Sequence, residues 1–221
     1  MNGGDWTFEH DGLTLELRAT DAGQVGLFPE HIGMLSWLRA RVADRAAAGT
    51  PVAVLHLFAY TGLASLAMAA EGAGVTHVDA SRPAVAWARR NAELSALSGR
   101  PIRWIVDDAV AFTQREARRG RRYAGVVLDP PSYGHGPGAR PWRLEDDLAR
   151  LLAACGAILE PDAFALLTAH TPGFDAERLR EQAGRSFGWH GAAIEGGDLA
   201  LSALDGRRLD LGAFARRAGG A

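Results

Sequence analysis

The chain of 221 residues is long enough for one large domain with a sizeable core. Hydrophobic residues make up 48% of it and charged residues 23%, which is typical of a globular protein. The net charge of −2 disfavours tight non-specific binding to nucleic acid, because such binding depends on neutralising phosphates. All 24 basic residues are arginines, so any phosphate contact must come from a guanidinium group.

Nothing in the sequence indicates a membrane or secreted protein. No apolar run approaches the roughly 20 residues of a membrane span, and the first residues lack the basic-then-apolar pattern of a signal peptide. The one cysteine, Cys155, excludes an internal disulfide. We therefore expect a cytoplasmic protein that does not contact a membrane.

The N-terminal part, residues 1–50, predicts a β-hairpin and a helix. Apolar and polar residues alternate on both sides of Asp11-Gly12, a pair that accepts the positive φ angles of a tight turn. Pro29 then suits a first helical turn, and Gly49 can end the helix. We expect this part to pack on a ligand site formed by the second part, residues 51–221.

Strands and helices alternate in the second part. The pattern predicts strands at 52–58, 76–80, 102–107, 123–129 and 163–170. It predicts helices at 61–72, 81–97, 109–119, 144–159 and 175–187. A final hairpin around Asp205-Gly206 should make the last strand antiparallel to its neighbour. Repeated strand–helix units indicate an α/β, Rossmann-like fold, in which a mostly parallel sheet is covered by helices on both faces.

In such a sheet, ligands bind outside the carboxyl ends of the strands. The first strand ends in "LFAYTG", where Gly62 permits a tight turn toward the next helix, although one glycine alone is weak evidence. Asp79 ends the second strand, at a distance from Gly62 that is typical of a carboxylate holding a ribose diol. Ser81 is the better candidate for capping the helix that follows.

The third and fourth strands also end in acids. Of Asp107 and Asp108, one could accept a hydrogen bond from an adenine amino group while the other caps the next helix. We favour Asp108 for adenine. The fourth strand runs into Asp129-Pro130-Pro131-Ser132-Tyr133. Acids at three successive strand ends after a glycine turn favour a nucleoside ligand that carries no pyrophosphate.

These residues resemble the class I S-adenosylmethionine-dependent methyltransferases. The resemblance covers essentially the whole chain, on segments that include "LHLFAYTG", "VDASRPAVAWARRNAELS", "VVLDPPSYG" and "LLTAHTPG". Within that class the chain is similar to the bacterial 23S ribosomal RNA methyltransferases that modify cytosine carbon-5 or guanine nitrogen-7. The N-terminal "DAGQVGLFPEH" also resembles a segment of these enzymes that leads onto the methyl donor.

The resemblance implies a methyltransferase sheet, S-adenosylmethionine as cofactor, S-adenosylhomocysteine as product, and an RNA partner. It implies a donor site of four segments: Phe28, Pro29 and Glu30; Phe58, Ala59, Tyr60, Thr61 and Gly62; Asp79, Ala80 and Ser81; Asp107 and Asp108. It also implies a catalytic wall at Asp129, Pro130, Pro131, Ser132 and Tyr133 that faces the methyl acceptor. Ser132 stands where related turns have an aromatic residue, and Tyr133 could supply base stacking one position later.

The sequence departs from the cytosine carbon-5 pattern. That reaction needs a thiolate, yet the segment after the fifth strand, "LLTAHTPGF", has no cysteine. Cys155 lies on the apolar face of a predicted helix and is interpreted as a core residue. A nitrogen or oxygen acceptor is therefore favoured over cytosine carbon-5. A small-molecule or protein methyltransferase on the same fold is the alternative.

Some of the histidines lie in or near predicted strands or the loops that follow them. His135 and His170 are candidates for a general base or a substrate contact, whereas His56 lies mid-strand and is interpreted as structural. No Cys/His cluster has zinc spacing, so the sequence predicts no metal.

The missing Gly-x-Gly-x-x-Gly pattern disfavours a nicotinamide oxidoreductase. A donor-binding partner subunit without catalysis remains open, and the oligomeric state is not indicated.

Overall fold

The computed structural model describes residues 6–21, 23–134, 141–189 and 194–219. The N-terminal part forms β1 (Trp6–His10), β2 (Leu13–Leu17), the 3-10 helix η1 (Pro29–His31) and α1 (Ile32–Ala47). The main sheet contains β3 (Ala53–Leu57), β4 (Gly74–Asp79), β5 (Ile102–Val106), β6 (Tyr123–Leu128), β9 (Leu159–Ala169), β10 (Glu195–Ser202) and β11 (Arg208–Arg217). The other helices are α2 (Leu63–Ala70), α3 (Arg82–Leu94), α4 (Ala109–Arg118), α5 (Leu144–Gly156) and α6 (Ala176–Phe187).

The seven strands of the main sheet lie in the order β10-β11-β9-β6-β3-β4-β5. Strands β3, β4, β5, β6 and β9 are parallel, while β11 runs antiparallel to both β9 and β10. The predicted α/β fold with an antiparallel last strand is therefore confirmed. After β5 the chain returns to the other side of β3, so the switch in strand order lies between β3 and β6. A crevice is expected outside the carboxyl ends of these two strands.

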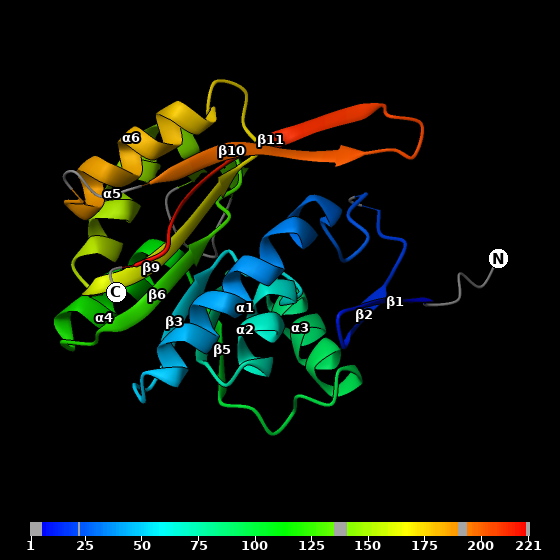
Figure 1. Cartoon of the computed structure of the whole chain (residues 1–221), viewed down its shortest axis with the longest axis horizontal. Helices are drawn as coiled ribbons and strands as arrows, with labels where there is room; N and C mark the ends of the chain where they lie inside the picture. Colours follow the sequence, from blue (N-terminus) through cyan, green and yellow to red (C-terminus); the bar gives the residue numbers. More distant parts are fainter. Residues whose placement is uncertain (1–5, 22, 135–140, 190–193, 220–221) are drawn as a thin grey trace.

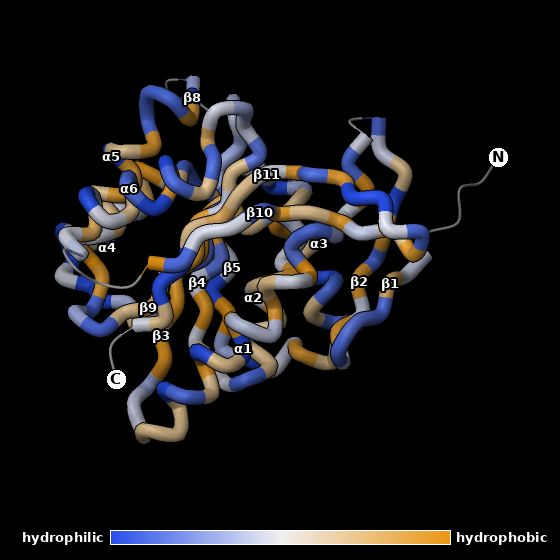
Figure 2. The backbone as a smooth tube through the Cα atoms, turned by 45° about the horizontal axis from the view of Figure 1, so that its top comes forward, coloured by the Kyte–Doolittle hydropathy of each residue, from blue (hydrophilic) through white to orange (hydrophobic). Residues whose placement is uncertain are grey.

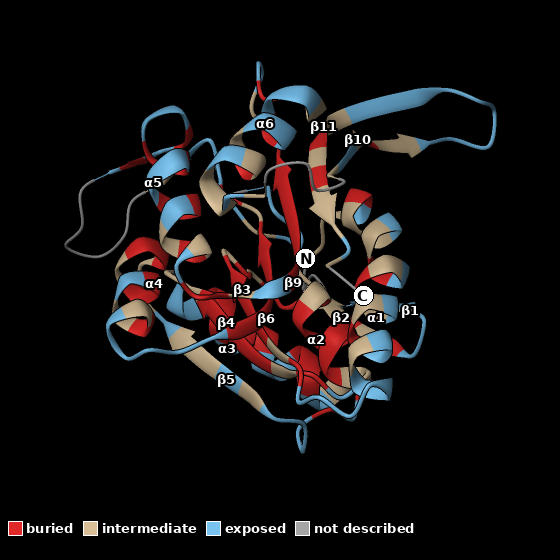
Figure 3. Ribbon diagram, turned by 60° about the vertical axis from the view of Figure 1, so that its left-hand side comes forward, coloured by how far each residue is buried: buried red, intermediate tan, exposed pale blue. Residues whose placement is uncertain are grey.

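Helices cover both faces of the sheet (Figure 1), with α1, α2 and α3 on one side and α4, α5 and α6 on the other. The alternation of side chains along the strands supplies both cores. Leu55 and Leu57 of β3 pack with α4 and α5, whereas Val54 packs with Leu38 of α1 and Met68 of α2. Figure 3 shows this burial: the central strands are red, and the far end of the β10–β11 hairpin is exposed.

The N-terminal hairpin is attached to α3. The backbone N–H groups of Thr14 and Glu16 donate to Ser95 Oγ (3.0 Å) and Asn91 Oδ1 (2.9 Å), and Trp87 Nε1 donates to the Glu16 carbonyl (3.1 Å). The chain then passes through Gly26, where a Cβ atom would lie 2.4 Å from the Trp87 ring. Only glycine permits this approach, which leads the chain toward the switch point.

Two local features differ from the sequence prediction. The helix predicted at 144–159 ends at Gly156, and the strand predicted at 163–170 begins already at Leu159. The register between β6 and β9 shifts, and Pro161 lies in this irregular stretch of β9. Proline has no N–H to donate to a neighbouring strand, so it is tolerated where the regular ladder is interrupted. The small ladder β7 (Tyr133–Gly134) with β8 (Trp142–Arg143) was not predicted, because two-residue strands carry no periodicity.

The hydropathy of the chain follows this architecture. Apolar residues run along the interior strands, and polar residues gather on the outer helix faces and turns (Figure 2). Within the described part of the chain, no helix has both the length and the apolar character needed to cross a membrane.

Candidate methyl-donor and acceptor site

A cavity of about 790 Å³ lies at the switch point, outside the carboxyl ends of β3, β4, β5 and β6. Its described lining contains twelve residues that the sequence assigned to the donor site or the catalytic wall, besides the candidate His170: Phe28, Phe58, Tyr60, Asp79, Ala80, Ser81, Asp107, Asp108, Asp129, Pro130, Pro131 and Ser132. Gln24, Trp142 and His170 also line it. The predicted strand ends therefore meet in one place.

The loop after β3 has a strained backbone. Phe58 and Tyr60, neither of them glycine, have φ angles of 55° and 48°, and Gly62 has a φ angle of 91°. The positive φ angle favours glycine at position 62, and a Cβ atom there would make a tight contact of 3.1 Å with the Ala88 side chain. Strained non-glycine residues are found mainly at functional sites, where surrounding contacts hold them.

Asp79 at the end of β4 supports this loop. Its Oδ2 accepts the Tyr60 N–H and its Oδ1 accepts the Ser81 N–H, both at 2.8 Å. Burial raises the pKa of the Asp79 carboxyl, although these two backbone bonds oppose the shift. Each oxygen keeps a further lone pair, so the carboxylate can still accept the two hydroxyls of a ribose. Ser81 caps α3 through a 3.3 Å bond from Ala84 N, as predicted.

The two acids at the end of β5 divide their roles differently from the prediction. Asp108, favoured for adenine, is itself the cap of α4, because its Oδ1 accepts Ala111 N at 2.8 Å. Asp107 was then expected to cap the helix. It instead accepts the Asp108 N–H at 2.9 Å and forms an ion pair with Arg115. Both line the cavity, and the contact of either with adenine stays a prediction.

The Asp129-Pro130-Pro131-Ser132 turn is fixed by residues that follow it. Trp142 Nε1 donates to the Pro131 carbonyl at 2.7 Å, and Leu144 N donates to the Ser132 carbonyl at 3.1 Å. The Trp142 ring also packs against Phe58, with ring centroids 5.2 Å apart. Trp142 therefore joins the acceptor wall to the loop after β3, a role that the sequence did not indicate.

Other candidates lie apart from this cavity. Ala59, Thr61 and Gly62 line a smaller adjoining cavity of about 50 Å³ instead. Pro29, Glu30 and Tyr133 are not among the described residues that line either cavity. Tyr133 is 54% exposed. His135 lies outside the described residues.

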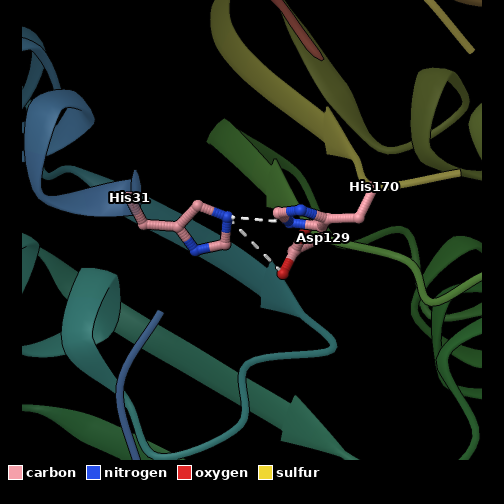
Figure 4. Close-up of side chains that lie close together, drawn as sticks. All are labelled: His31, Asp129 and His170. Carbon is pink, nitrogen blue, oxygen red and sulfur yellow. Dashed lines mark hydrogen bonds and ion pairs between the residues drawn. The ribbon is translucent and has the colours of Figure 1, made fainter. Parts of the chain in front are cut away.

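His31, Asp129 and His170 form a cluster in the wall (Figure 4). His170 Nε2 lies 3.2 Å from Asp129 Oδ1, His31 Nε2 lies 3.7 Å from Asp129 Oδ2, and the two Nε2 atoms lie 3.2 Å apart. The Thr168 hydroxyl donates to Asp129 Oδ1 at 2.6 Å. His170 was a candidate from the sequence, but His31 was missed, although it directly follows Phe28-Pro29-Glu30.

The electrostatics of this cluster favour an ion pair. Burial alone would lower the pKa of His170, but the Asp129 carboxylate, the Leu211 carbonyl and Glu30 raise it to about 9. Burial alone would raise the pKa of Asp129, but His31, His170 and the Thr168 hydroxyl lower it to about 2. At neutral pH the wall therefore presents a carboxylate already paired with an imidazolium.

The only thiol of the chain is remote from this chemistry. Cys155 is fully buried in the core between α5 and the sheet. Burial raises the pKa of its thiol to about 12, so it is not a thiolate at neutral pH. Its interpretation as a core residue is confirmed.

Fold and site together define a nucleoside-binding Rossmann-like protein. The described cavity lining has four aspartates and no arginine, and these carboxylates disfavour a ligand with further negative charge. The same lining fits S-adenosylmethionine, because a ribose carboxylate, aromatic walls and acidic residues suit a nucleoside with a cationic sulfonium. That cofactor supplies a methyl group already activated for attack by a lone pair.

Comparison with known proteins specifies the family. A solved S-adenosylmethionine-dependent methyltransferase from Agrobacterium tumefaciens is 39% identical, with a TM-score of 0.91 over 98% of this chain and 71% of that one. The chain belongs to the S-adenosylmethionine-dependent methyltransferases. A 16S ribosomal RNA methyltransferase from Thermus thermophilus, solved with AdoMet and guanosine, is 20% identical with a TM-score of 0.61, and shares the fold. No protein-family model matches the chain.

Curated relatives include the ribosomal RNA large subunit methyltransferases K/L. The enzyme of Magnetococcus marinus is 29% identical over 170 residues, which is 76% of this chain. That of Shewanella frigidimarina is 31% identical over 156 residues, or 70% of this chain. The chain spans only about a fifth of the length of these relatives (22% and 21%).

Proposed function

We propose that this methyltransferase acts on RNA, with ribosomal RNA as the favoured substrate, and methylates a nitrogen or oxygen atom rather than cytosine carbon-5. The observation that carries the proposal is the Asp129-Pro130-Pro131-Ser132 turn on the wall of the donor cavity. The ribosomal RNA enzymes among the relatives support the RNA substrate. The domain division at residue 50, with the first part lying against the donor site, belongs to the same proposal.

The turn can position an acceptor without further chemistry. A sulfonium methyl needs mainly an attacking lone pair held in line with it, so alignment is the main contribution of the protein. Trp142 Nε1 fixes the Pro131 carbonyl, and the Asp129 carboxylate is held by Thr168 and His170. A rigid turn of this kind can hold a base amino or hydroxyl group by hydrogen bonds. Tyr133, exposed beside it, can stack on an unpaired base.

The cysteine position supports the choice of acceptor atom. Methylation of cytosine carbon-5 requires a thiolate that adds to the ring. The chain has one cysteine, and its thiol is buried and protonated at neutral pH. Thr168, His170 and Thr171 occupy the end of β9 and the segment after it. A nitrogen or oxygen lone pair needs no such nucleophile, because it attacks the methyl group directly.

The test is transfer of a labelled methyl group to total RNA, total protein and a small-molecule extract. We expect label in RNA, and nuclease digestion should yield N- or O-methylated nucleosides. The Asp129→Asn variant should lose about a hundredfold in rate, because acceptor positioning is lost. Asp79→Asn should instead weaken S-adenosylhomocysteine binding by about tenfold, since a bond to a charged group is removed.

Asp44→Asn is the matched control, because Asp44 is an exposed aspartate on α1 that pairs only with nearby Arg41 among the described contacts. It should change neither binding nor transfer. Label found in protein or small molecules, with none in RNA, would support the alternative substrate. Recovery of 5-methylcytosine would contradict the proposed nitrogen or oxygen acceptor. A wild-type protein that neither binds S-adenosylhomocysteine nor transfers a methyl group would contradict the donor site.

A further inference from the structure

We propose that His31, Asp129 and His170 bind one divalent transition-metal cation in the acceptor wall. Three donor atoms converge there: the Nε2 atoms of both histidines and a carboxylate oxygen of Asp129. They come from η1, from the residue after β9 and from the residue after β6, so no local spacing indicates the site. The inference goes beyond methyl transfer and does not depend on which acceptor is methylated.

The distances fit a small cation. With metal–ligand bonds of about 2.0–2.1 Å, neighbouring donors lie about 2.8–3.0 Å apart in octahedral geometry and about 3.3–3.4 Å apart in tetrahedral geometry. The pair of Nε2 atoms and the His170–Asp129 pair are both separated by 3.2 Å. His31 Nε2 lies 3.7 Å from the other carboxylate oxygen, Oδ2, so one cation would be held by both oxygens of Asp129 or after a small rotation of the carboxylate. Figure 4 shows Nε2 of His31 directed at the other two side chains.

The surroundings of the ligands are those of a metal site. His170 Nδ1 lies 2.7 Å from the Leu211 carbonyl, which can only accept, so Nδ1 carries a proton. A bound cation would therefore take the place of the proton on Nε2, the ring nitrogen that faces His31 and Asp129. A metal-bound histidine typically donates its other N–H to a backbone carbonyl in this way. The Thr168 hydroxyl bonded to Asp129 Oδ1 similarly orients the carboxylate ligand.

The cluster also has open sides. Asp129 and His170 line the 790 Å³ cavity, while His31 and Asp129 line the 50 Å³ cavity. Two imidazoles and one carboxylate with open positions are a set typical of Fe²⁺, and imidazole also suits Zn²⁺ and Co²⁺; Mg²⁺ and Ca²⁺ prefer oxygen ligands. A cation here would have a free position facing the cavity, where it could ligate an acceptor oxygen or nitrogen and lower its pKa.

Co²⁺ is the probe for the test, because its visible absorption reports the ligands directly. Protein treated with a chelator is titrated with CoCl₂, and binding is followed by absorption and calorimetry. We expect one site per chain. His31→Ala and His170→Ala should each weaken binding by about a hundredfold, since each removes a ligand. His10→Ala, which removes a histidine of β1 remote from the cluster, should leave binding unchanged.

Binding of S-adenosylhomocysteine and circular dichroism, measured on each variant, show that the fold and the donor site persist. The proposal is overturned if the wild type binds no Co²⁺ at millimolar concentration. It is equally overturned if the His31→Ala/His170→Ala double variant gives the same spectrum and affinity as the wild type. Neither result bears on methyl transfer, which is measured separately with labelled donor.

Discussion

At the residue scale, two buried histidines lie beneath the loop after β3. His56 Nδ1 and His77 Nδ1 lie 2.7 Å and 3.0 Å from the same hydroxyl, Ser65 Oγ of α2. Burial lowers the pKa of His56 to about 3 and holds that of His77 well below its usual value. Both rings are therefore neutral in the folded protein near neutral pH, and His56 has the structural role that its mid-strand position indicated.

These histidines predict a loss of stability in acid. The unfolded chain binds a proton at each histidine near pH 6.5, whereas the folded chain binds one at His56 only near pH 3. The stability that His56 contributes is therefore complete above pH 6.5 and falls as the pH drops below it. Each histidine should contribute about 1 kcal/mol for each pH unit. Urea unfolding of the wild type and of His56→Asn, measured from pH 7.5 to 5, checks this.

His56→Asn should have a lower free energy of unfolding than the wild type even at neutral pH, because packing is lost. The decisive quantity is the slope of the free energy of unfolding against pH. We expect a shallower slope for His56→Asn than for the wild type. Equal slopes would show that His56 binds its proton equally well in the folded and unfolded states. The claim that burial keeps this histidine neutral would then be wrong.

At the scale of elements, the short β7–β8 ladder supports the acceptor wall. Trp142 in β8 is buried, and its Nε1 donates to the Pro131 carbonyl at 2.7 Å. Without that donor the carbonyl would lose its partner and the turn its fixed position. The ring of Pro131 restricts the backbone but does not by itself position the Pro131 carbonyl. The β7–β8 ladder, which carries Trp142, is therefore part of the site.

Trp142→Phe tests this support while keeping an aromatic ring against Phe58. We expect a loss of about 1 kcal/mol in the free energy of unfolding, because the partly buried hydrogen bond to the Pro131 carbonyl is lost. The rate of methyl transfer should fall while affinity for S-adenosylhomocysteine stays the same. Trp189→Phe is the control, since Trp189 packs against Phe187 and Arg217. Transfer by Trp142→Phe at the wild-type rate would contradict the supporting role.

At the scale of the whole molecule, one core holds the only thiol. Cys155 packs among side chains of α4, α5 and the sheet, where no solvent reaches it. Its Sγ fills volume in a close-packed interior, so its removal leaves a small cavity. The thiol is separated from the donor cavity, since it is not among the residues that line it.

Cys155→Ala should therefore destabilise the protein by about 1 kcal/mol without changing methyl transfer. Chemical unfolding gives the stability, and labelled transfer at a temperature where both proteins are folded gives the activity. A folded variant that transfers no methyl group would show that the thiol takes part in the reaction. The preference for a nitrogen or oxygen acceptor would then be wrong.

The sequence by itself determined the order of strands and helices, the hairpin turn at Asp11-Gly12, the cap at Ser81 and the acids at the strand ends. These features depend on local periodicity and on backbone preferences of single residues, which a sequence carries directly. The parallel sheet follows, and with it the meeting of the strand ends at one edge. For this reason the donor cavity could be predicted before its geometry was known.

The tertiary structure alone decided how the wall is built. His31 meets His170 because η1 packs near β10, while the Leu211 carbonyl of β11 fixes the His170 ring. Trp142 reaches Pro131 through contacts that depend on how elements pack. No period or motif encodes a distance between residues 31 and 170, because that distance depends on the final hairpin lying against the N-terminal segment.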